Sequence, residues 1–369
     1  MERKVFIKSL LLSIAGSTLL SNMANAENTL STSEDGQKRW MDILEYARWC
    51  PSPHNTQPWK VKIISDTEAH ILYEPQRLVP EEDPMSAFMI IGMTMFCECI
   101  KIASVPYGLK SEIIYADEQK LNSDATDLQM FSIIKFTKDK VAIEVDRELI
   151  RKRKTSRLHY QGKAIDSEVV AELQEIVSSH GNKLTATNEK EMIEWVLDLN
   201  GFTLFSDMDD DKVRKEIGKW VRTTDDEAHK TNDGLWHHCM RFPGILMNNF
   251  FFHHERFAGK RIRKVLAKVY RNSMKGTKTI AWIDGGFSTK DDFIKCGKSL
   301  LYMWLCMTKH NIFLHPFGSV ITNVEANKKL KDKISSPEQT KLWLLMRLGY
   351  SDEPPRSLRR PLTEIVINA

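Results

Sequence analysis

The hydrophobic pattern of the chain starts with an amphipathic helix. Trp40, Ile43, Leu44 and Ala47 recur at i, i+3, i+4 and i+7, a spacing that is typical of a helix with one buried face. We expect the helix to end at Pro51, because the position before a proline disfavours the helical conformation. A turn-rich loop then leads to the next element.

Strand-like and helix-like patterns alternate through the rest of the chain. Residues 59–64 alternate between apolar and polar side chains, which predicts a strand. Residues 86–105 are apolar almost all round, which predicts a buried helix. Further strands are expected at 111–116, 130–136 and 341–348, and further helices at 147–157, 167–179, 189–206 and 292–309. This mixture predicts the α+β class.

The order of these elements indicates an internal duplication. The regions 27–146 and 147–369 each combine a surface helix, strands and a buried helix with an internal glycine. Those glycines are Gly92 and Gly297. We therefore expect two halves of similar construction in one chain.

Composition excludes several classes of protein. With 42% hydrophobic and 28% charged residues, the 369-residue chain is an ordinary globular protein. Its net charge of +4, from 53 basic and 49 acidic residues, argues against a nucleic-acid binder. Six cysteines are too few for a disulfide scaffold and are interpreted as core residues, although an oxidising compartment could pair some of them.

The N-terminus has the pattern of an export signal. Positive charge at 3–8 precedes an apolar stretch at 9–20 and an Ala-Asn-Ala cleavage site at 24–26. We expect residues 1–26 to be a signal peptide and the mature protein to begin at Glu27, exported to the periplasm. The Arg-Lys pair at positions 3 and 4 leaves both a twin-arginine and a general secretion route open. The alternative to a signal peptide is an N-terminal helix that lies on the core of the protein.

Common catalytic motifs are absent from the sequence. It contains no G-x-G-x-x-G, H-E-x-x-H or G-x-S-x-G pattern, so a Rossmann dinucleotide site, a zincin and a serine hydrolase are unsupported. No carboxylate pair or nucleophile–histidine arrangement stands out. We predict no catalytic side chain and no metal site.

Two arginine clusters are candidates for anion binding. Arg153 and Arg157 lie one helical turn apart in the predicted helix, with the Thr155 hydroxyl between them. Two guanidinium groups that converge on one point suit a phosphate dianion. The alternative is a solvated basic helix end. A second cluster, or charged tail, consists of Arg356, Arg359 and Arg360.

Several segments together resemble one family. Residues 49–59, Trp-Cys-Pro-Ser-Pro-His-Asn-Thr-Gln-Pro-Trp, resemble the A-P-S-x-x-N-x-Q-P-W segment of the nitroreductase-like FMN-dependent family. Residues 153–160 resemble its R-x-[ST]-x-R phosphate-binding motif. Segments at 220–222, 233–235 and 347–362 resemble the long Acg-type branch, whose chains carry two tandem halves and often an export signal.

The resemblance implies a fold, a cofactor and a set of site residues. It implies a nitroreductase-like fold in which the two halves form an internal pseudo-dimer around one FMN. The phosphate would be held by Arg153, Thr155 and Arg157, with help from Arg359 or Arg360. Ser52 and Asn55 would hydrogen-bond the flavin, and the backbone at Gly318 would lie near its N5 atom.

Aromatic side chains and then cations dominate residues 232–278. By the resemblance, this segment is a lid insertion that folds over the flavin. Contact of residues 250–278 with an anionic membrane surface remains an alternative. Paired histidines and a cysteine at 237–239 could bind zinc, but their spacing matches no standard site.

We therefore expect an FMN-dependent oxidoreductase of the nitroreductase type, acting on a small organic acceptor or donor. The alternative is a flavin-sequestering or storage protein with a closed lid and little turnover. No nucleic-acid partner is expected. The substrate, the electron donor, and the choice between a monomer and a homodimer are left open by the sequence.

Overall fold

The computed structural model describes residues 32–207, 209–257, 259–334 and 340–367. The expected signal peptide, residues 1–26, lies outside the described residues. Helices and strands are both abundant, and the predicted α+β class is confirmed.

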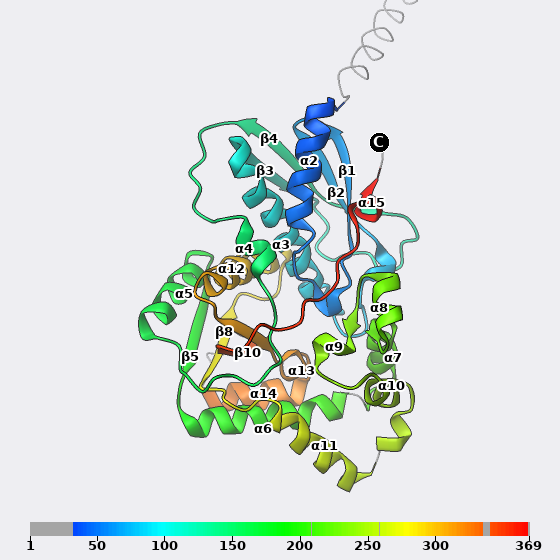
Figure 1. Cartoon of the computed structure of the whole chain (residues 1–369), viewed down its shortest axis with the longest axis vertical. Helices are drawn as coiled ribbons and strands as arrows, with labels where there is room; N and C mark the ends of the chain where they lie inside the picture. The colour runs from blue at the N-terminus through cyan, green and yellow to red at the C-terminus, as the bar shows by residue number, and fades with distance from the viewer. Residues whose placement is uncertain (1–31, 208, 258, 335–339, 368–369) are drawn as a thin grey trace, which may run out of the picture.

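The first half is built on a five-stranded sheet with the order β11-β1-β2-β4-β3. Its strands are β1 (Trp59–Ser65), β2 (Glu68–Tyr73), β3 (Leu109–Tyr115), β4 (Gln129–Lys138) and β11 (Val366–Ile367). Strands β1 to β4 pair antiparallel, whereas β11 pairs parallel with β1. The C-terminal strand β11 therefore returns to the first sheet, beside β1. Figure 1 shows α15, which precedes it, next to this sheet.

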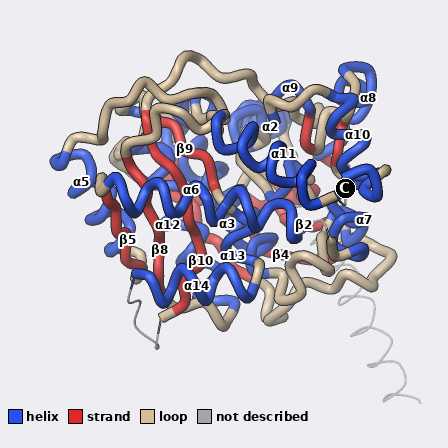
Figure 2. Tube along the Cα trace, turned by 90° about the horizontal axis from the view of Figure 1, so that it is seen from below, coloured by secondary structure: helices blue, strands red, loops and turns tan. Residues whose placement is uncertain are grey.

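The second half is built on a four-stranded antiparallel sheet with the order β5-β8-β10-β9. Its strands are β5 (Asn182–Thr187), β8 (Thr279–Gly285), β9 (Phe313–Pro316) and β10 (Lys341–Gly349). Figure 2 shows β5, β8 and β10 side by side. A short parallel pair is formed by β6 (Val221–Arg222) and β7 (Leu235–Trp236).

Two buried helices connect the halves. They are α3 (Ala87–Ser104) and α12 (Lys290–Lys309), which pack against each other. A Cβ atom at Gly297 would lie 2.8 Å from the Thr94 Cβ and 3.0 Å from the Ile91 carbonyl oxygen. Only glycine leaves room for this close approach of the two helices.

The other helices surround this centre (Figure 1). They are α2 (Glu34–Ala47), α4 (Glu148–Lys152), α5 (Ser167–Ser179), α6 (Lys190–Asp207), α7 (Asp211–Lys219), α8 (Asp225–Thr231), α9 (His237–Met240), α10 (Gly244–Phe252), α11 (Lys260–Asn272), α13 (Gly318–Thr322), α14 (Val324–Ile334) and α15 (Leu362–Ile365). Among the described residues, Ala87–Tyr107 is the one helical stretch long and apolar enough to cross a membrane, and 83% of its apolar window is buried inside the protein.

The second sheet is buried on both faces. In β8, Ala281 and Ile283 belong to the main core with α3 and α12. The alternate residues Ile280 and Trp282 belong to a second core with α6, α13 and α14. This period-two alternation explains why all seven residues of β8 are buried.

Residues 211–252 form a unit that we call the cover segment. Ile217, Val221 and Met247 make a small separate core in it, together with partly buried aromatic side chains. The cover segment thus has its own apolar centre, and its Trp220 also packs into the main core.

The helix predicted at 147–157 is shorter in the structure than expected. Helix α4 ends at Lys152, and Arg153 has an extended ψ of 129°. The Ser156 amide then donates to the Leu314 carbonyl oxygen at 3.1 Å, and Thr155 forms an isolated bridge with Leu314. Backbone pairing with β9 replaces the helical hydrogen bonds, so the segment runs extended.

The other predicted helices and strands are confirmed in type. Strands β2, β5, β8 and β9 and the two-residue strands β6, β7 and β11 were not predicted. Strand β8 is buried along its whole length and lacks an alternating pattern. The division into regions 27–146 and 147–369 stays a prediction, and β11 joins the sheet of the other region.

Candidate functional site

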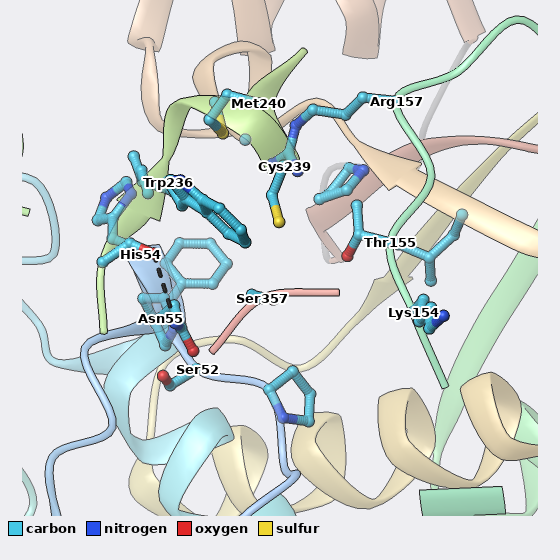
Figure 3. A pocket seen from close by; sticks show the side chains of 18 of the residues that line it. Ser52, His54, Asn55, Lys154, Thr155, Arg157, Trp236, Cys239, Met240 and Ser357 are labelled. Carbon is cyan, nitrogen blue, oxygen red and sulfur yellow. Dashed lines mark hydrogen bonds between the residues drawn. The ribbon is translucent and has the colours of Figure 1, made fainter. Parts of the chain in front are cut away.

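A cavity of about 400 Å³ lies where the two halves and the cover segment meet. Its walls include the loop at 51–55, the extended segment at 153–157, the start of α13, the C-terminal segment at 355–359 and the cover segment, together with side chains of the buried helices α3 and α12. Figure 3 shows side chains from several of these parts pointing into one space.

Most of the residues predicted for the site line this cavity. They are Ser52, Asn55, Arg153, Thr155, Arg157, Gly318 and Arg359. Arg360 does not line it. The Arg360 guanidinium is ion-paired with Glu74 and with Glu364, and its amide donates to the Gln57 side-chain oxygen at 2.9 Å. Arg360 therefore fastens the C-terminal segment to the first half.

The extended conformation explains how Arg153, Thr155 and Arg157 reach the same cavity. In a strand-like segment, alternate side chains point to the same side. The prediction that the two arginines share the face of a helix is thus wrong in geometry, although all three side chains still line one space.

Arg153 is a buried cation with few partners. Its side chain donates to the Trp49 carbonyl oxygen at 3.1 Å, and its guanidinium lies 4.3 Å from the Trp304 ring centre. Its Nε atom has no hydrogen-bond partner. Burial lowers the pKa of Arg153 to about 10, because the charged form has lost its hydration.

Two C-terminal arginines join Arg153. The Arg359 guanidinium donates to the Asn55 Oδ1 atom at 2.9 Å, and that of Arg356 lies 3.6 Å from the Trp49 ring centre. Burial, followed by repulsion from Arg153, lowers the pKa of Arg359 to about 9. The Nε atoms of Arg356 and Arg359 lack hydrogen-bond partners.

We call Arg153, Arg356 and Arg359 the arginine trio. Within the described part of the chain, none of the three forms an ion pair with a carboxylate. Buried charges are normally paired. The trio therefore creates an uncompensated positive region with unused donor atoms, which is the chemistry of an anion site.

Arg157 lies in a different part of the cavity. Figure 3 places it beside Cys239 and Met240 of the cover segment, away from Ser52. Burial lowers its pKa, and its electrostatic neighbours include Tyr270 and Cys239 rather than the trio. No described residue forms a hydrogen bond or ion pair with it. The cavity thus has two separate cationic regions.

Acidic residues that the sequence reasoning missed line another wall. The His54 Nε2 atom is hydrogen-bonded to Glu82. Asp83 accepts hydrogen bonds from the amides of Ala87, at 2.8 Å, and Met89, at 3.0 Å. Burial raises the pKa of Asp83 to about 6. The signal available in the sequence was the acidic run directly before the buried helix.

The His54–Glu82 pair predicts a pH-dependent effect on stability. Burial alone would lower the pKa of His54, but the charge and hydrogen bond of Glu82 raise it above the ordinary value of 6.5. The pair therefore stabilises the fold fully below pH 6.5, and this contribution is lost as the pH rises through the folded-state pKa.

We expect His54→Asn to lower the free energy of unfolding at pH 6 and to have a smaller effect at pH 9. Asparagine tolerates the positive φ of 46° at this position. Chemical denaturation of parent and variant at both pH values measures the difference. An equal loss at the two pH values would contradict a charged pair.

Polar contacts fasten the cover segment to the first half. The Asp233 carboxylate is ion-paired with Arg77, at 2.8 Å, and with Arg222, at 2.6 Å. We call these three residues the latch. The Asn55 side chain also donates to the Gly234 carbonyl oxygen at 3.3 Å. At Gly234, a Cβ atom would lie 2.4 Å from the Trp220 carbonyl oxygen, so the latch turn requires glycine.

Cysteines and potential metal ligands lie mostly elsewhere. Five of the six cysteines are buried, whereas Cys239 is half-buried and lines the cavity. Burial raises its pKa to about 11. The described residues contain one metal-ligand-like cluster, Glu172 with Cys306 and His310, outside the cavity. Its His310 Nε2 and Glu172 Oε2 atoms already pair at 2.7 Å.

No protein-family model matches the sequence, and a search of curated proteins finds no match. A comparison with solved structures finds similarity to several proteins, among them the following three. An iodotyrosine deiodinase bound to FMN and 3-iodo-L-tyrosine is 11% identical, with a TM-score of 0.35, over 58% of this chain and 94% of that chain.

The other two are nitroreductases. FMN-dependent NfnB from Mycobacterium smegmatis, in complex with NADPH, is 14% identical, with a TM-score of 0.35, over 59% of this chain and 94% of that chain. A nitroreductase with bound FMN from Bacteroides fragilis is 15% identical, with a TM-score of 0.34, over 58% of this chain and 92% of that chain. TM-scores of this size establish neither a common fold nor a common activity.

Proposed function

We propose that the cavity binds FMN and that the protein is a flavin-dependent oxidoreductase of the nitroreductase type, acting on a small organic acceptor or donor. The observation that carries the proposal is the arginine trio, which brings the buried guanidinium groups of Arg153 and Arg359 and the half-buried one of Arg356, all without carboxylate partners among the described residues, to a largely apolar cavity. The R-x-T-x-R motif at 153–157 supports the same cofactor.

The residues present suit the two chemical parts of FMN. A phosphate dianion accepts charge-assisted hydrogen bonds, which would satisfy the Nε atoms of the trio. A planar ring needs apolar walls, and Met95, Trp236 and Leu300 supply them. A volume of about 400 Å³ lies in the range of small-molecule sites.

We assign the phosphate to the trio, with the Thr155 hydroxyl beside it. Arg157, in the other cationic region, would stabilise negative charge on the ring when the flavin is reduced. FMN, when bound, supplies hydride-transfer chemistry. The Asn55 side chain donates to two carbonyl oxygens and accepts from Arg359, so we propose that it positions Arg359; its predicted bond to the flavin stays a prediction.

The remaining walls would control water and protons. The cover segment supplies Trp236, Cys239 and Met240 on one side of the cavity (Figure 3), and we propose that it limits access of water. The His54–Glu82 pair would hold a proton at the wall of the cavity. On this proposal the two halves act as a nitroreductase-like pseudo-dimer, with α3 and α12 packed at its centre.

We further propose that the protein acts outside the cytoplasm. The charged and apolar pattern of residues 1–26 supports this. N-terminal sequencing of protein purified from its native cell measures it: a start at Glu27 is expected, and an intact Met1 in the soluble cytoplasmic fraction would refute export.

The test of the proposed function is a visible absorbance spectrum followed by turnover. The purified protein should be yellow, should bleach when dithionite or NADPH is added, and should reoxidise with a nitroaromatic or a quinone. Failure to bind FMN overturns the assignment. Bound flavin that dithionite reduces but that no acceptor reoxidises would instead indicate storage.

Gly318 gives a steric test of the same site. A Cβ atom there would meet no atom within 4 Å, so a larger side chain can enter the cavity without disturbing the fold. We expect Gly318→Leu to weaken FMN binding by about 5- to 150-fold, the range for overfilling a packed site, while Gly318→Ala binds nearly as the parent. Fluorescence titration with FMN measures both; unchanged affinity for the leucine variant would place the flavin elsewhere.

A further inference from the structure

Helix α11 (Lys260–Asn272) has an exposed apolar strip. One side of the helix packs on α6, where the Asn200 side chain donates to the Tyr270 hydroxyl at 3.2 Å. On another side, Ile262, Val265 and Val269 are 45%, 62% and 56% exposed. Their spacing of i, i+3 and i+7 places them in one row along the helix.

A row of cations runs beside this apolar strip. Arg261, Lys264 and Lys268 are exposed and have the same spacing, shifted by one residue. No described residue forms an ion pair with any of the three. By contrast, Arg263 and Arg271, nearer to α6, are paired with Asp209 and with Glu194 and Asp198. The unpaired cations are therefore those that face outward.

The charges along α11 do not stabilise the helix itself. The helix has no acidic residue, and several cations stand in its first two turns. Positive charge near a helix N-terminus opposes the helix dipole and destabilises the helix slightly. A partner with negative charge and an apolar layer would offset both the unpaired cations and the exposed aliphatic side chains.

We propose that α11 docks on the surface of an anionic lipid bilayer. The aliphatic row would enter the boundary between headgroups and acyl chains, and the cationic row would contact lipid phosphates. A nucleic acid would use the cations but leave the aliphatic row in water. A second copy of the chain is disfavoured, because a 13-residue helix is only about 20 Å long, too small for a standard interface.

This docking leaves the cavity accessible. No residue of α11 lines the cavity, and Figure 1 shows the helix at the edge of the molecule, at the opposite end from β4. The proposal narrows the membrane interpretation of residues 250–278 to one helix, and it does not depend on the identity of the cofactor.

The decisive measurement is hydrogen–deuterium exchange of the full chain with vesicles. Vesicles of phosphatidylcholine containing phosphatidylglycerol should slow exchange in peptides from 260–272, whereas pure phosphatidylcholine should not. Because exchange is measured for each peptide, it distinguishes binding through α11 from binding through the basic and apolar N-terminal segment alone. Binding without protection of α11 would overturn the proposal.

Two double variants test the two rows separately by co-sedimentation. Lys264→Glu with Lys268→Glu, and Val265→Ser with Val269→Ser, should each reduce α11-dependent binding to anionic vesicles, the first by at least about tenfold. Matched controls at the other end of the molecule are Lys110→Glu with Lys140→Glu and Ile114→Ser with Ile143→Ser, all at exposed positions.

The controls should bind as the parent does. If they lose as much binding as the α11 variants, net charge or general hydrophobicity explains the effect and the proposal fails. It fails equally if a DNA duplex protects α11 and the serine variant keeps full binding, because the partner would then be a nucleic acid.

Discussion

Replacing Arg153 and Arg359 together by methionine is expected to lower the affinity for FMN by roughly 10²–10⁴-fold. Each charge-assisted hydrogen bond to a phosphate contributes about 1.5–3 kcal/mol, and every 1.4 kcal/mol is about tenfold in affinity. Methionine keeps much of the apolar stem, so packing against Trp304 is largely preserved. Fluorescence titration of the flavin-free protein measures the loss.

The same variant should lose little stability without flavin. Burial and mutual repulsion already oppose both charges in the flavin-free protein, so their removal relieves a cost that offsets the lost hydrogen bonds. Arg360→Met is the matched control, because Arg360 is ion-paired with Glu74 and Glu364. It should lower the free energy of unfolding by about 3 kcal/mol and leave FMN affinity nearly unchanged.

The opposite pattern would refute the assignment of the trio. If the double variant unfolds easily without flavin but still binds FMN as the parent does, the two arginines are structural and the phosphate lies elsewhere. If Arg360→Met alone abolishes flavin binding in a folded protein, the phosphate site is centred on the other side of the C-terminal segment.

Asp233→Ala is expected to release the cover segment from the first half. Asp233 is 4% exposed and pairs with both Arg77 and Arg222. Its removal leaves Arg222 without a carboxylate partner among the described residues and Arg77 with Glu74 alone, a loss of about 3–5 kcal/mol. The separate small core of the cover segment makes local opening the expected result rather than global unfolding. If release of FMN requires this opening, its rate should rise roughly 10²-fold or more.

Stopped-flow release of FMN and limited proteolysis measure the opening. New cleavage within 211–252 is expected in the variant. Asp211→Asn is the control, because Asp211 pairs with Arg214 at the exposed surface of the same segment, where solvent screening leaves an ion pair little effect on stability. A latch variant that releases flavin at the parent's rate would show that the cover segment does not limit access.

The latch and the arginine trio meet at Asn55. Its side chain accepts from Arg359 and donates to Gly234, the residue after Asp233. One short loop of the first half therefore contacts both the proposed phosphate site and the cover. This connection explains why a motif of Pro, Ser, Asn and Gln, with no catalytic group of its own, lies at the centre of the site.

Local patterns in the sequence predicted the two buried helices, several surface helices and four of the strands. The helical spacing from Trp40 and the all-round apolar segment at 86–105 predicted α2 and α3 because burial of one face, or of every face, leaves a direct periodic trace. Ser52 and Thr155 were named through the resemblance of residues 49–59 and 153–160 to family motifs. Arg153 and Arg359 stood out also by their chemistry, because clustered guanidinium groups suit an anion.

Only the tertiary structure decided how those residues are grouped. Pairing of Thr155 with Leu314 turned a predicted helix into an extended segment, which separated Arg157 from Arg153. Arg359 was brought into the cavity and Arg360 turned away, toward Glu74. Contacts between residues hundreds of positions apart leave no local pattern, because each depends on backbone hydrogen bonds and charge partners that exist only after the chain has folded.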